Sequence, residues 1–273
     1  MVGIRHHTHP TLGFVTSTPL QFDRTEDRRP TPSEYRISLA EGVEQKAAVQ
    51  RLRHQIFSTE YPAALSGPDG LDVDESDDGC DHLMVWRADR QGPRRLVAAC
   101  RLLPPYRRKG AELYTAAEFD LTSVTRLLGD TVEVGRTCVS PEERAGTAIC
   151  AVWGGIARYV LLTGNRYLIG CASVSLADGG ANARAIAAEL AAAGRPDRAL
   201  DCRPHRPFPL DRPGEPGRRA VAPPLLRGYL RLGARVGEVP AWDPDFGTAD
   251  FPVLLDYQQV PQRYLNHFLA EGR

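Results

Sequence analysis

The sequence lacks the features that mark nucleic-acid-binding, membrane-spanning and secreted proteins. Its 34 basic and 34 acidic side chains cancel over 273 residues, whereas a nucleic-acid-binding protein is usually strongly basic. No apolar run reaches the roughly 18 residues that span a membrane, and the N-terminal residues have no apolar core of the kind that a signal peptide needs. The six cysteines include no Cys-x-x-Cys pair, so we expect buried, reduced thiols in a cytoplasmic protein that is not exported.

The motifs of several enzyme classes are missing too. Without a Gly-x-Ser-x-Gly elbow, a Walker loop or a Rossmann glycine fingerprint, nothing supports a hydrolase, a nucleotidase or a dehydrogenase. The acidic stretch 72–79 fits a calcium loop poorly, because a loop beginning at Asp74 has Val85 at its twelfth position, where a bidentate glutamate is required. We therefore predict no metal. Two alternatives stay open for this stretch: a solvated acidic turn, or carboxylates, Asp72 and Asp74 above all, that bind an amine-bearing substrate.

The chain divides into a tail and one domain. Residues 1–33, with histidines at positions 6, 7 and 9, show no periodicity and predict a disordered N-terminal tail. Residues 34–273 are predicted to form a single domain in which 203–219, rich in arginine and proline, is an irregular loop. The apolar patterns predict an α/β (or α+β) fold with a mixed central sheet flanked by helices. Strands are expected at 35–39, 82–86, 95–103, 131–139, 167–174 and 251–255, and helices at 43–57, 116–128, 147–163, 181–193, 225–232 and 262–269.

The most informative stretch runs from Glu133 through Arg136 into a helix that begins near position 147. A strand that ends in a short loop at a helix N-terminus presents free backbone N–H groups and a positive dipole end, which suit a phosphate. Glu133 and Arg136 are three residues apart, so a regular strand would put them on opposite faces unless a bulge intervenes. Arg101 would pair with Glu133 if both lay on one face of neighbouring strands. A purely structural salt bridge is the alternative for each of these three side chains.

Several motifs, in order along the chain, resemble one family. They include Leu52-Arg53-His-Gln-Ile-Phe57, Asp72-Val-Asp74, Ala99-Cys-Arg101, Tyr114 to Phe119, Glu133-Val-Gly-Arg136-Thr-Cys-Val and Asp245-Phe-Gly-Thr-Ala-Asp250-Phe. With these motifs, the chain from about 35 to 268 resembles the GNAT-superfamily acyltransferases that use acyl carrier protein thioesters, most of all the ornithine N-acyltransferases of ornithine-lipid synthesis. It is similar more distantly to the acyl-homoserine-lactone synthases and the N-acyl amino acid synthases.

This resemblance implies a fold and an activity. The fold is a GNAT-like mixed central sheet. The activity is transfer of a (3-hydroxy)acyl chain from acyl carrier protein to the α-amino group of ornithine or a similar amino acid, the first step of ornithine-lipid synthesis. The acyl carrier protein thioester is then a co-substrate, and no other cofactor is expected. The partners are acyl carrier protein and the amino acid, with no nucleic acid, and a peripheral contact with the inner face of the membrane stays open.

The resemblance also implies roles for individual residues. Glu133 would take a proton from the acceptor amine, directly or through water, while nearby backbone N–H groups polarise the thioester carbonyl. The loop 139–147 would hold the pantetheine arm and its phosphate. By the same resemblance, Glu133, Arg136 and Arg101 are catalytic, Arg53, Phe57, Asp72 and Asp74 bind the acceptor substrate, and Val139, Arg144, Gly146 and Thr147 bind the pantetheine of the acyl donor.

Three adjacent cations, Arg107, Arg108 and Lys109, predict a docking surface for the acidic carrier protein, with a solvated surface as the alternative. Two other functions stay open for the chain. One is the synthesis of an N-acyl signalling lipid, in which S-adenosylmethionine would replace ornithine. The other is a non-catalytic module that binds lipid or carrier protein, although the presence of both Glu133 and Arg136 argues against it.

Overall fold

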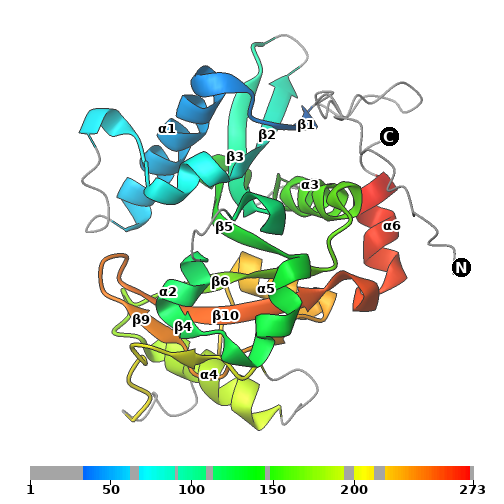
Figure 1. Ribbon diagram of the computed structural model, residues 1–273. Helices are drawn as coiled ribbons and strands as arrows, with labels where there is room; N and C mark the ends of the chain where they lie inside the picture. The colour runs from blue at the N-terminus through cyan, green and yellow to red at the C-terminus, as the bar shows by residue number, and fades with distance from the viewer. Residues whose placement is uncertain are drawn as a thin grey trace, which may run out of the picture.

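The protein folds around one eight-stranded sheet (Figure 1). The computed structural model describes residues 33–61, 68–89, 92–108, 113–144, 148–193, 200–211 and 219–270, so the predicted tail, except for its last residue, lies outside them. The strands lie in the order β1-β2-β3-β5-β6-β10-β8, and β9 pairs with β10. Their bounds are Ser33–Leu39 (β1), Asp81–Asp89 (β2), Arg95–Leu103 (β3), Thr131–Val139 (β5), Tyr167–Ser175 (β6), Arg235–Val236 (β8), Ala241–Asp243 (β9) and Thr248–Asp256 (β10).

Pairing within this sheet is antiparallel except between β5 and β6, which run parallel. Helix α3 (Ala148–Thr163) joins these two strands as a crossover connection, as parallel strands require. The predicted mixed α/β sheet is therefore confirmed. Sequence periodicity gives no signal for β8 and β9, because strands of two and three residues are too short to alternate visibly.

Helices cover both faces of the sheet. Helix α1 (Gly42–Glu60) packs Val49 and Ile56 onto Met84 and Cys138 of one face. Helix α3 is apolar almost all round and is buried against the opposite face. The other helices divide in the same way, with α2 (Tyr114–Glu118) on the face of α1, and α4 (Ala181–Ala192), α5 (Pro224–Leu232) and α6 (Gln262–Ala270) on the face of α3.

The helix expected at 116–128 is divided into three pieces. Helix α2 ends at Glu118, the two-residue strand β4 (Phe119–Asp120) follows, and a 3₁₀ helix, η4 (Thr122–Asp130), completes the segment. The Asp120 carboxylate accepts hydrogen bonds from the backbone N–H and the hydroxyl of Thr122, which compete with helical bonding there. Strand β4 pairs with β7 (Arg203–Pro204), so the expected irregular loop at 203–219 contains a short strand. Residues 212–218 of that loop lie outside the described part.

All six cysteines are free thiols, in agreement with the prediction. Four are buried, and Cys150 and Cys171 are partly exposed. Within the described ranges, no helix combines the length and the apolar composition that crossing a bilayer demands.

Candidate active site

Strands β5 and β6 run together at first and then separate. Their parallel pairing extends from Thr131 and Tyr167 to Val134 and Gly170, after which β5 continues beside β3 and β6 beside β10. The close approach at the last pair requires a glycine, because a Cβ at Gly170 would lie 2.4 Å from the Val134 carbonyl oxygen. Figure 1 shows the two strands diverging at the centre of the molecule. A cavity of about 300 Å³ occupies the gap between them.

A β-bulge in β5 shapes one wall of this cavity. Ala99 of β3 pairs with Cys138 and Arg101 pairs with Gly135, so β5 has one extra residue between these pairs. Arg136 takes a left-handed backbone conformation there, with φ of 49°. Such a conformation costs a non-glycine residue about 1–3 kcal/mol and is common at functional sites. In a regular strand, the three-residue spacing would put Glu133 and Arg136 on opposite faces. The bulge removes this restriction and allows both side chains to line the same cavity.

The Glu133 carboxylate is held at the N-terminus of helix α2. Its Oε2 atom accepts a hydrogen bond from the Tyr114 backbone N–H at 3.0 Å. Its Oε1 atom accepts from the Thr115 N–H at 2.7 Å and from the Thr115 hydroxyl at 2.6 Å. A carboxylate has about four acceptor positions, so these bonds fix its orientation and leave one position on Oε2 for a ligand.

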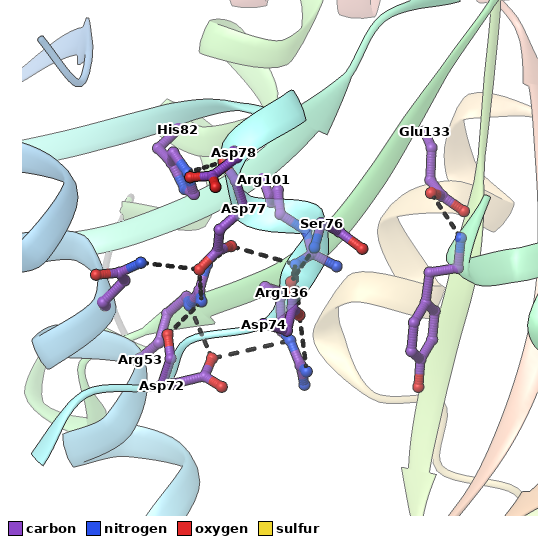
Figure 2. Close-up of polar contacts among 12 residues, drawn as sticks. Arg53, Asp72, Asp74, Ser76, Asp77, Asp78, His82, Arg101, Glu133 and Arg136 are labelled. Atoms are coloured by element: carbon purple, nitrogen blue, oxygen red, sulfur yellow. Dashed lines mark hydrogen bonds and ion pairs between the residues drawn. The ribbon is translucent and has the colours of Figure 1, made fainter. Parts of the chain in front are cut away.

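Three arginines and three aspartates form a network beside the cavity (Figure 2), which we call the arginine–aspartate cluster. Arg53 of α1 is fully buried; its Nε donates to Asp72 at 2.8 Å, and both terminal nitrogens donate to Asp77 at 2.9 Å. Asp74 accepts from Arg101 and, at 3.1 Å, from Arg136. Burial alone would raise the pKa of Asp77 and Asp74, but the arginine hydrogen bonds and charges outweigh it and hold both values below the usual range.

The cavity has two chemically different walls. On the face of α3 and α5 the wall is apolar, with Ile149, Leu225 and Tyr229. On the face of α1 and α2 it carries Glu133 and Arg136 as well as hydroxyl and carboxylate groups, and beside them the packed rings of Phe57, Tyr61 and Phe246. The gap between β5 and β6 therefore joins an apolar compartment to one that bears the charged and polar groups.

The polar wall also carries carboxylates to which the sequence analysis assigns no role. Glu118, Asp243 and Asp250, the carboxylate triad, each place one carboxylate oxygen within 4.8 Å of the others. Asp243 and Asp250 line the cavity, and Glu118 of α2 lies beside them. Burial and then the charge of Asp250 raise the pKa of Glu118, and burial raises that of Asp250. Within the described ranges, none of the three forms an ion pair with a cation.

Comparison with known proteins assigns the family. A family model described as an acetyltransferase (GNAT) domain matches residues 52–154. The L-ornithine N(alpha)-acyltransferase of Rhodobacter capsulatus is 34% identical over 259 residues, covering 89% of this chain and 98% of that protein. This chain belongs to the L-ornithine N(alpha)-acyltransferase family. The Brucella abortus member is 32% identical, covering 82% of this chain and 85% of its own. The family and the GNAT domain make the protein an acyltransferase, as predicted.

Solved structures to which the chain is similar include an AHL synthase and an N-acyl amino acid synthase. The AHL synthase LasI has a TM-score of 0.44 at 11% identity, covering 82% of this chain and 90% of that chain. FeeM, an N-acyl amino acid synthase from uncultured soil microbes, has a TM-score of 0.42 at 11% identity, covering 83% of this chain and 92% of that chain.

In this L-ornithine N(alpha)-acyltransferase family member, the predicted site residues fall into three groups. Arg53, Asp72 and Asp74, predicted to bind the acceptor, belong to the arginine–aspartate cluster and do not line the cavity. Gly146 and Thr147 lie outside the described residues. The predicted residues that line the cavity are Phe57, Arg101, Glu133, Arg136, Val139 and Arg144.

The expected pair of Arg101 and Glu133 does not form. Register places them diagonally on one face of neighbouring strands, as the expectation required. Arg101 instead turns to Asp74 and Asp77, while Glu133 is occupied by the α2 N-terminus. The loop between α1 and β2 supplies these acidic partners. Only the folded chain brings the loop beside Arg101, so the pairing could not be read from the sequence.

The predicted carrier-protein surface changes as well. The half-buried Arg108 side chain donates to the backbone carbonyls of Leu128 and Thr131, so it braces the 3₁₀ helix η4, and its part in carrier-protein docking stays a prediction. Arg107 remains partly exposed and pairs with Asp81 at 3.1 Å. Lys109 lies outside the described residues.

Proposed function

We propose that this acyltransferase transfers a (3-hydroxy)acyl chain from an acyl carrier protein thioester to the α-amino group of L-ornithine, as the first step of ornithine-lipid synthesis. The observation that carries the proposal is the two-walled cavity at the separation of β5 and β6, which joins an apolar compartment to a carboxylate-bearing one. The names of the relatives described above support ornithine as the acceptor.

The apolar wall suits the acyl chain of the donor. Leu225 and Tyr229 of α5 and Ile149 of α3 present hydrocarbon surface to the cavity. Beyond Val134 the edge of β5 that faces β6 has no strand partner among the described residues, and these backbone groups suit the amides of a pantetheine arm. Arg144 lines the same cavity, donates to the Val139 carbonyl at 3.2 Å and pairs with Glu60, and we infer that its guanidinium also meets the phosphate of that arm.

The polar wall suits the attacking amine. An α-ammonium group must lose a proton before its nitrogen can attack the thioester carbon. The remaining acceptor position of Glu133 Oε2 is where that proton passes to the enzyme, directly or through water. The C–N bond then forms, the C–S bond breaks, and the carrier thiolate leaves and takes up a proton from solvent or from Glu133. No covalent enzyme intermediate is needed, since a thiolate is a good leaving group.

The test is a direct assay of the full chain. The protein is incubated with 3-hydroxyacyl carrier protein, or with the matching coenzyme A thioester, and a panel of amino acids, and products are identified by mass spectrometry. We expect N-acyl ornithine as the main product, with fragmentation that places the acyl group on the α-nitrogen. The absence of any N-acyl amino acid would contradict the proposal, and equal use of both donors would contradict the carrier-protein part of it.

A variant tests the apolar wall separately. Leu225→Asp puts a charge where the acyl chain lies, so turnover of long-chain donors should fall more than tenfold while short-chain donors are much less affected. Leu225→Met keeps the apolar volume and is the matched control. An equal effect of Leu225→Asp on long and short donors would place the chain elsewhere.

A further inference from the structure

One wall of the cavity carries a buried carboxylate that the described residues do not fully satisfy. Asp250 is 2% exposed and lines the cavity, and no N–H group or hydroxyl of the described residues donates to its Oδ1 atom. Glu118 Oε2 likewise has no such donor, and the two carboxyl groups hydrogen-bond each other only by sharing a proton. Once that proton is lost, two buried acceptors are left unpaired at a free-energy cost, and a cationic ligand can take the place of the proton.

The third member of the carboxylate triad is held in place by neutral groups. One oxygen of Asp243 accepts from the backbone N–H groups of Asp245 and Phe246 at 2.9 and 3.0 Å, which fixes the carboxylate at the turn after β9. Its other oxygen lies 3.5 Å from the Tyr114 hydroxyl. These contacts orient Asp243 toward the cavity without neutralising its charge.

The cations of the cavity wall are engaged elsewhere. Arg101 and Arg136 are bound to Asp74, and Arg144 is bound to Glu60. The carboxylate triad therefore has no cationic partner among the described residues of the cavity wall, and it is separate from the arginine side chains that line the cavity.

We propose that the carboxylate triad is the subsite for a second cationic group of the acceptor, the side-chain ammonium of a diamino acid such as ornithine. This inference rests on the proposed function, because the same cavity receives the α-amino group beside Glu133. Asp243 and Asp250 accept charge-assisted hydrogen bonds from the ammonium, whose three N–H donors match the free carboxylate oxygens. The subsite holds the side-chain amine away from the thioester, so that the α-amino group is the one acylated.

An ammonium group matches the chemistry of the triad, because it offers three N–H donors to carboxylate oxygens that an apolar side chain would leave without a donor. A divalent cation is the competing ligand, since water can complete its coordination shell beside three carboxylates, and the metal arms of the experiment below separate the two. The raised pKa values of Glu118 and Asp250 agree with a cationic ligand of either kind, because a nearby positive charge offsets the cost of burying these carboxylates and the repulsion between them.

The experiment compares ornithine with norvaline, which has the same carbon chain without the side-chain amine. Steady-state kinetics with both acceptors are measured for the parent, Asp250→Asn and Asp243→Asn, with Asp245→Asn as the control. Asp245 is exposed and lies in the same turn, outside the triad. Binding is measured in parallel, without donor, from the rise in melting temperature that ornithine, norvaline, magnesium or calcium produces in each protein.

We expect the parent to prefer ornithine over norvaline. Each triad variant should raise the KM for ornithine about 10- to 100-fold, the effect of losing one charge-assisted contact, and leave norvaline unchanged or improved. Asp245→Asn should behave as the parent. In the binding experiment, ornithine should stabilise the parent and the control but not Asp250→Asn.

Several results would overturn the subsite while leaving the proposed function intact. They are equal use of norvaline and ornithine by the parent, an unchanged preference in both triad variants, or stabilisation by magnesium or calcium that exceeds that by ornithine and disappears in Asp250→Asn. The reverse case is also distinguishable. If no amino acid is acylated, yet ornithine stabilises the parent and not Asp250→Asn, the subsite stands and the proposed function fails.

Discussion

Two groups of acidic side chains flank the same cavity, and they differ in what faces them. In the arginine–aspartate cluster, each of the three aspartates contacts at least one arginine, and the pKa values of Asp74 and Asp77 are lowered. In the carboxylate triad no cation is paired within the described residues, and the pKa values of Glu118 and Asp250 are raised. The first group is complete by itself, whereas the second has capacity left for a ligand.

The positions of the two groups explain this difference. The aspartates of the cluster come from the loop between α1 and β2, and its arginines from α1, β3 and β5, so the network ties that loop to the sheet. The triad is assembled from α2, β9 and β10 at the wall of a cavity. In the arginine–aspartate cluster, ion pairs attach the loop to the sheet. In the carboxylate triad, the lack of a cationic partner leaves the carboxylates able to bind a ligand.

Glu133 differs from both groups, because neutral N–H and hydroxyl donors fill most of the acceptor positions of its carboxylate. We expect its substitution to have the largest effect on activity. Glu133→Gln removes the proton acceptor, so kcat should fall roughly 10²–10⁴-fold. The deficit should shrink at high pH, where more of the acceptor amine is already neutral. Stability should also fall by about 1–3 kcal/mol, because the new amide N–H group faces the N–H donors of α2. Kinetics across pH and urea unfolding measure the two effects.

Thr115→Val is the matched control for Glu133. It removes one of the three hydrogen bonds to the carboxylate and keeps the side-chain shape and the carboxylate itself. Stability should drop by about 1 kcal/mol, with kcat within a few-fold of the parent. Turnover of Glu133→Gln within about threefold of the parent at neutral pH would make Glu133 a structural residue and move the search for the base to the carboxylate triad.

The next largest effect is on stability, and it should differ between the arginine–aspartate cluster and the carboxylate triad. Asp77→Asn leaves Arg53 with an uncompensated part of its charge in a fully buried position, and should destabilise the fold by about 3–5 kcal/mol. Asp250→Asn removes a buried charge with no cationic partner, so the unliganded protein should be as stable as the parent or more stable. Urea unfolding of the two variants side by side is the measurement.

A surface variant controls for the loop in which Asp77 lies. Asp78 is the next residue, its side chain is 95% exposed, and it pairs only with Lys46 in the described structure. Asp78→Asn should leave stability unchanged, since exposed ion pairs contribute little. Equal losses of stability in Asp77→Asn and Asp250→Asn would contradict the distinction between the arginine–aspartate cluster and the carboxylate triad.

The sequence predicts the strand-to-helix unit at Glu133 well, because periodicity and helix N-terminal chemistry are local. It also marks Asp72 and Asp74 as unusual. What neutralises them is not local: Arg53, Arg101 and Arg136 reach them from three separate elements. For that reason these two carboxylates, predicted to bind an amine, prove to be bound to arginines.

The carboxylate triad is not predicted as a site, although two of its members lie in stretches that resemble the family. Glu118 belongs to the motif 114–119 and Asp250 to the motif 245–251, but Glu118 is more than 120 residues before Asp243 and Asp250, and nothing local links the three. Only the fold of β10 beside β6, with α2 packed over them, brings the three together. The expected helix over 116–128 places Glu118 in its first turn, whereas in the structure Glu118 is the last residue of α2.

The pH dependence of the two groups should have opposite signs. The cluster has lowered pKa values, so its stabilising contribution is present above the ordinary carboxyl pKa of about 4 and is lost as the pH falls. Glu118 and Asp250 have raised pKa values, so the folded state prefers their protonated forms, and stability decreases as the pH rises through those values. The other titratable groups at this place are Asp243, which lies beside Glu118 and Asp250, and the Tyr114 hydroxyl, which contacts Asp243.

Melting temperatures measured with and without ornithine test the pH dependence predicted for the carboxylate triad. The stabilisation by ornithine should grow as the pH rises from about 5 to about 8, because deprotonated triad carboxylates bind the ammonium. Asp250→Asn should flatten that trend and leave the acid-side loss of stability unchanged. A stabilisation by ornithine that is constant over this range would mean that the triad does not titrate against the ligand.

The smallest expected effect concerns a partner that touches neither acidic group. Arg107 is 43% exposed and its only described ion pair is with Asp81, so it can contribute to a docking surface for an acidic carrier protein. Arg107→Glu should raise the KM for the acyl carrier protein donor about two- to fivefold, leave kcat unchanged, and reduce the dependence of that KM on salt, because charged surface contacts act mainly on encounter. Arg231→Glu reverses an exposed charge on another element, α5, and should have no such effect. If both variants keep the parental KM at every salt concentration, carrier-protein docking does not involve Arg107, and the surface around it is only solvated.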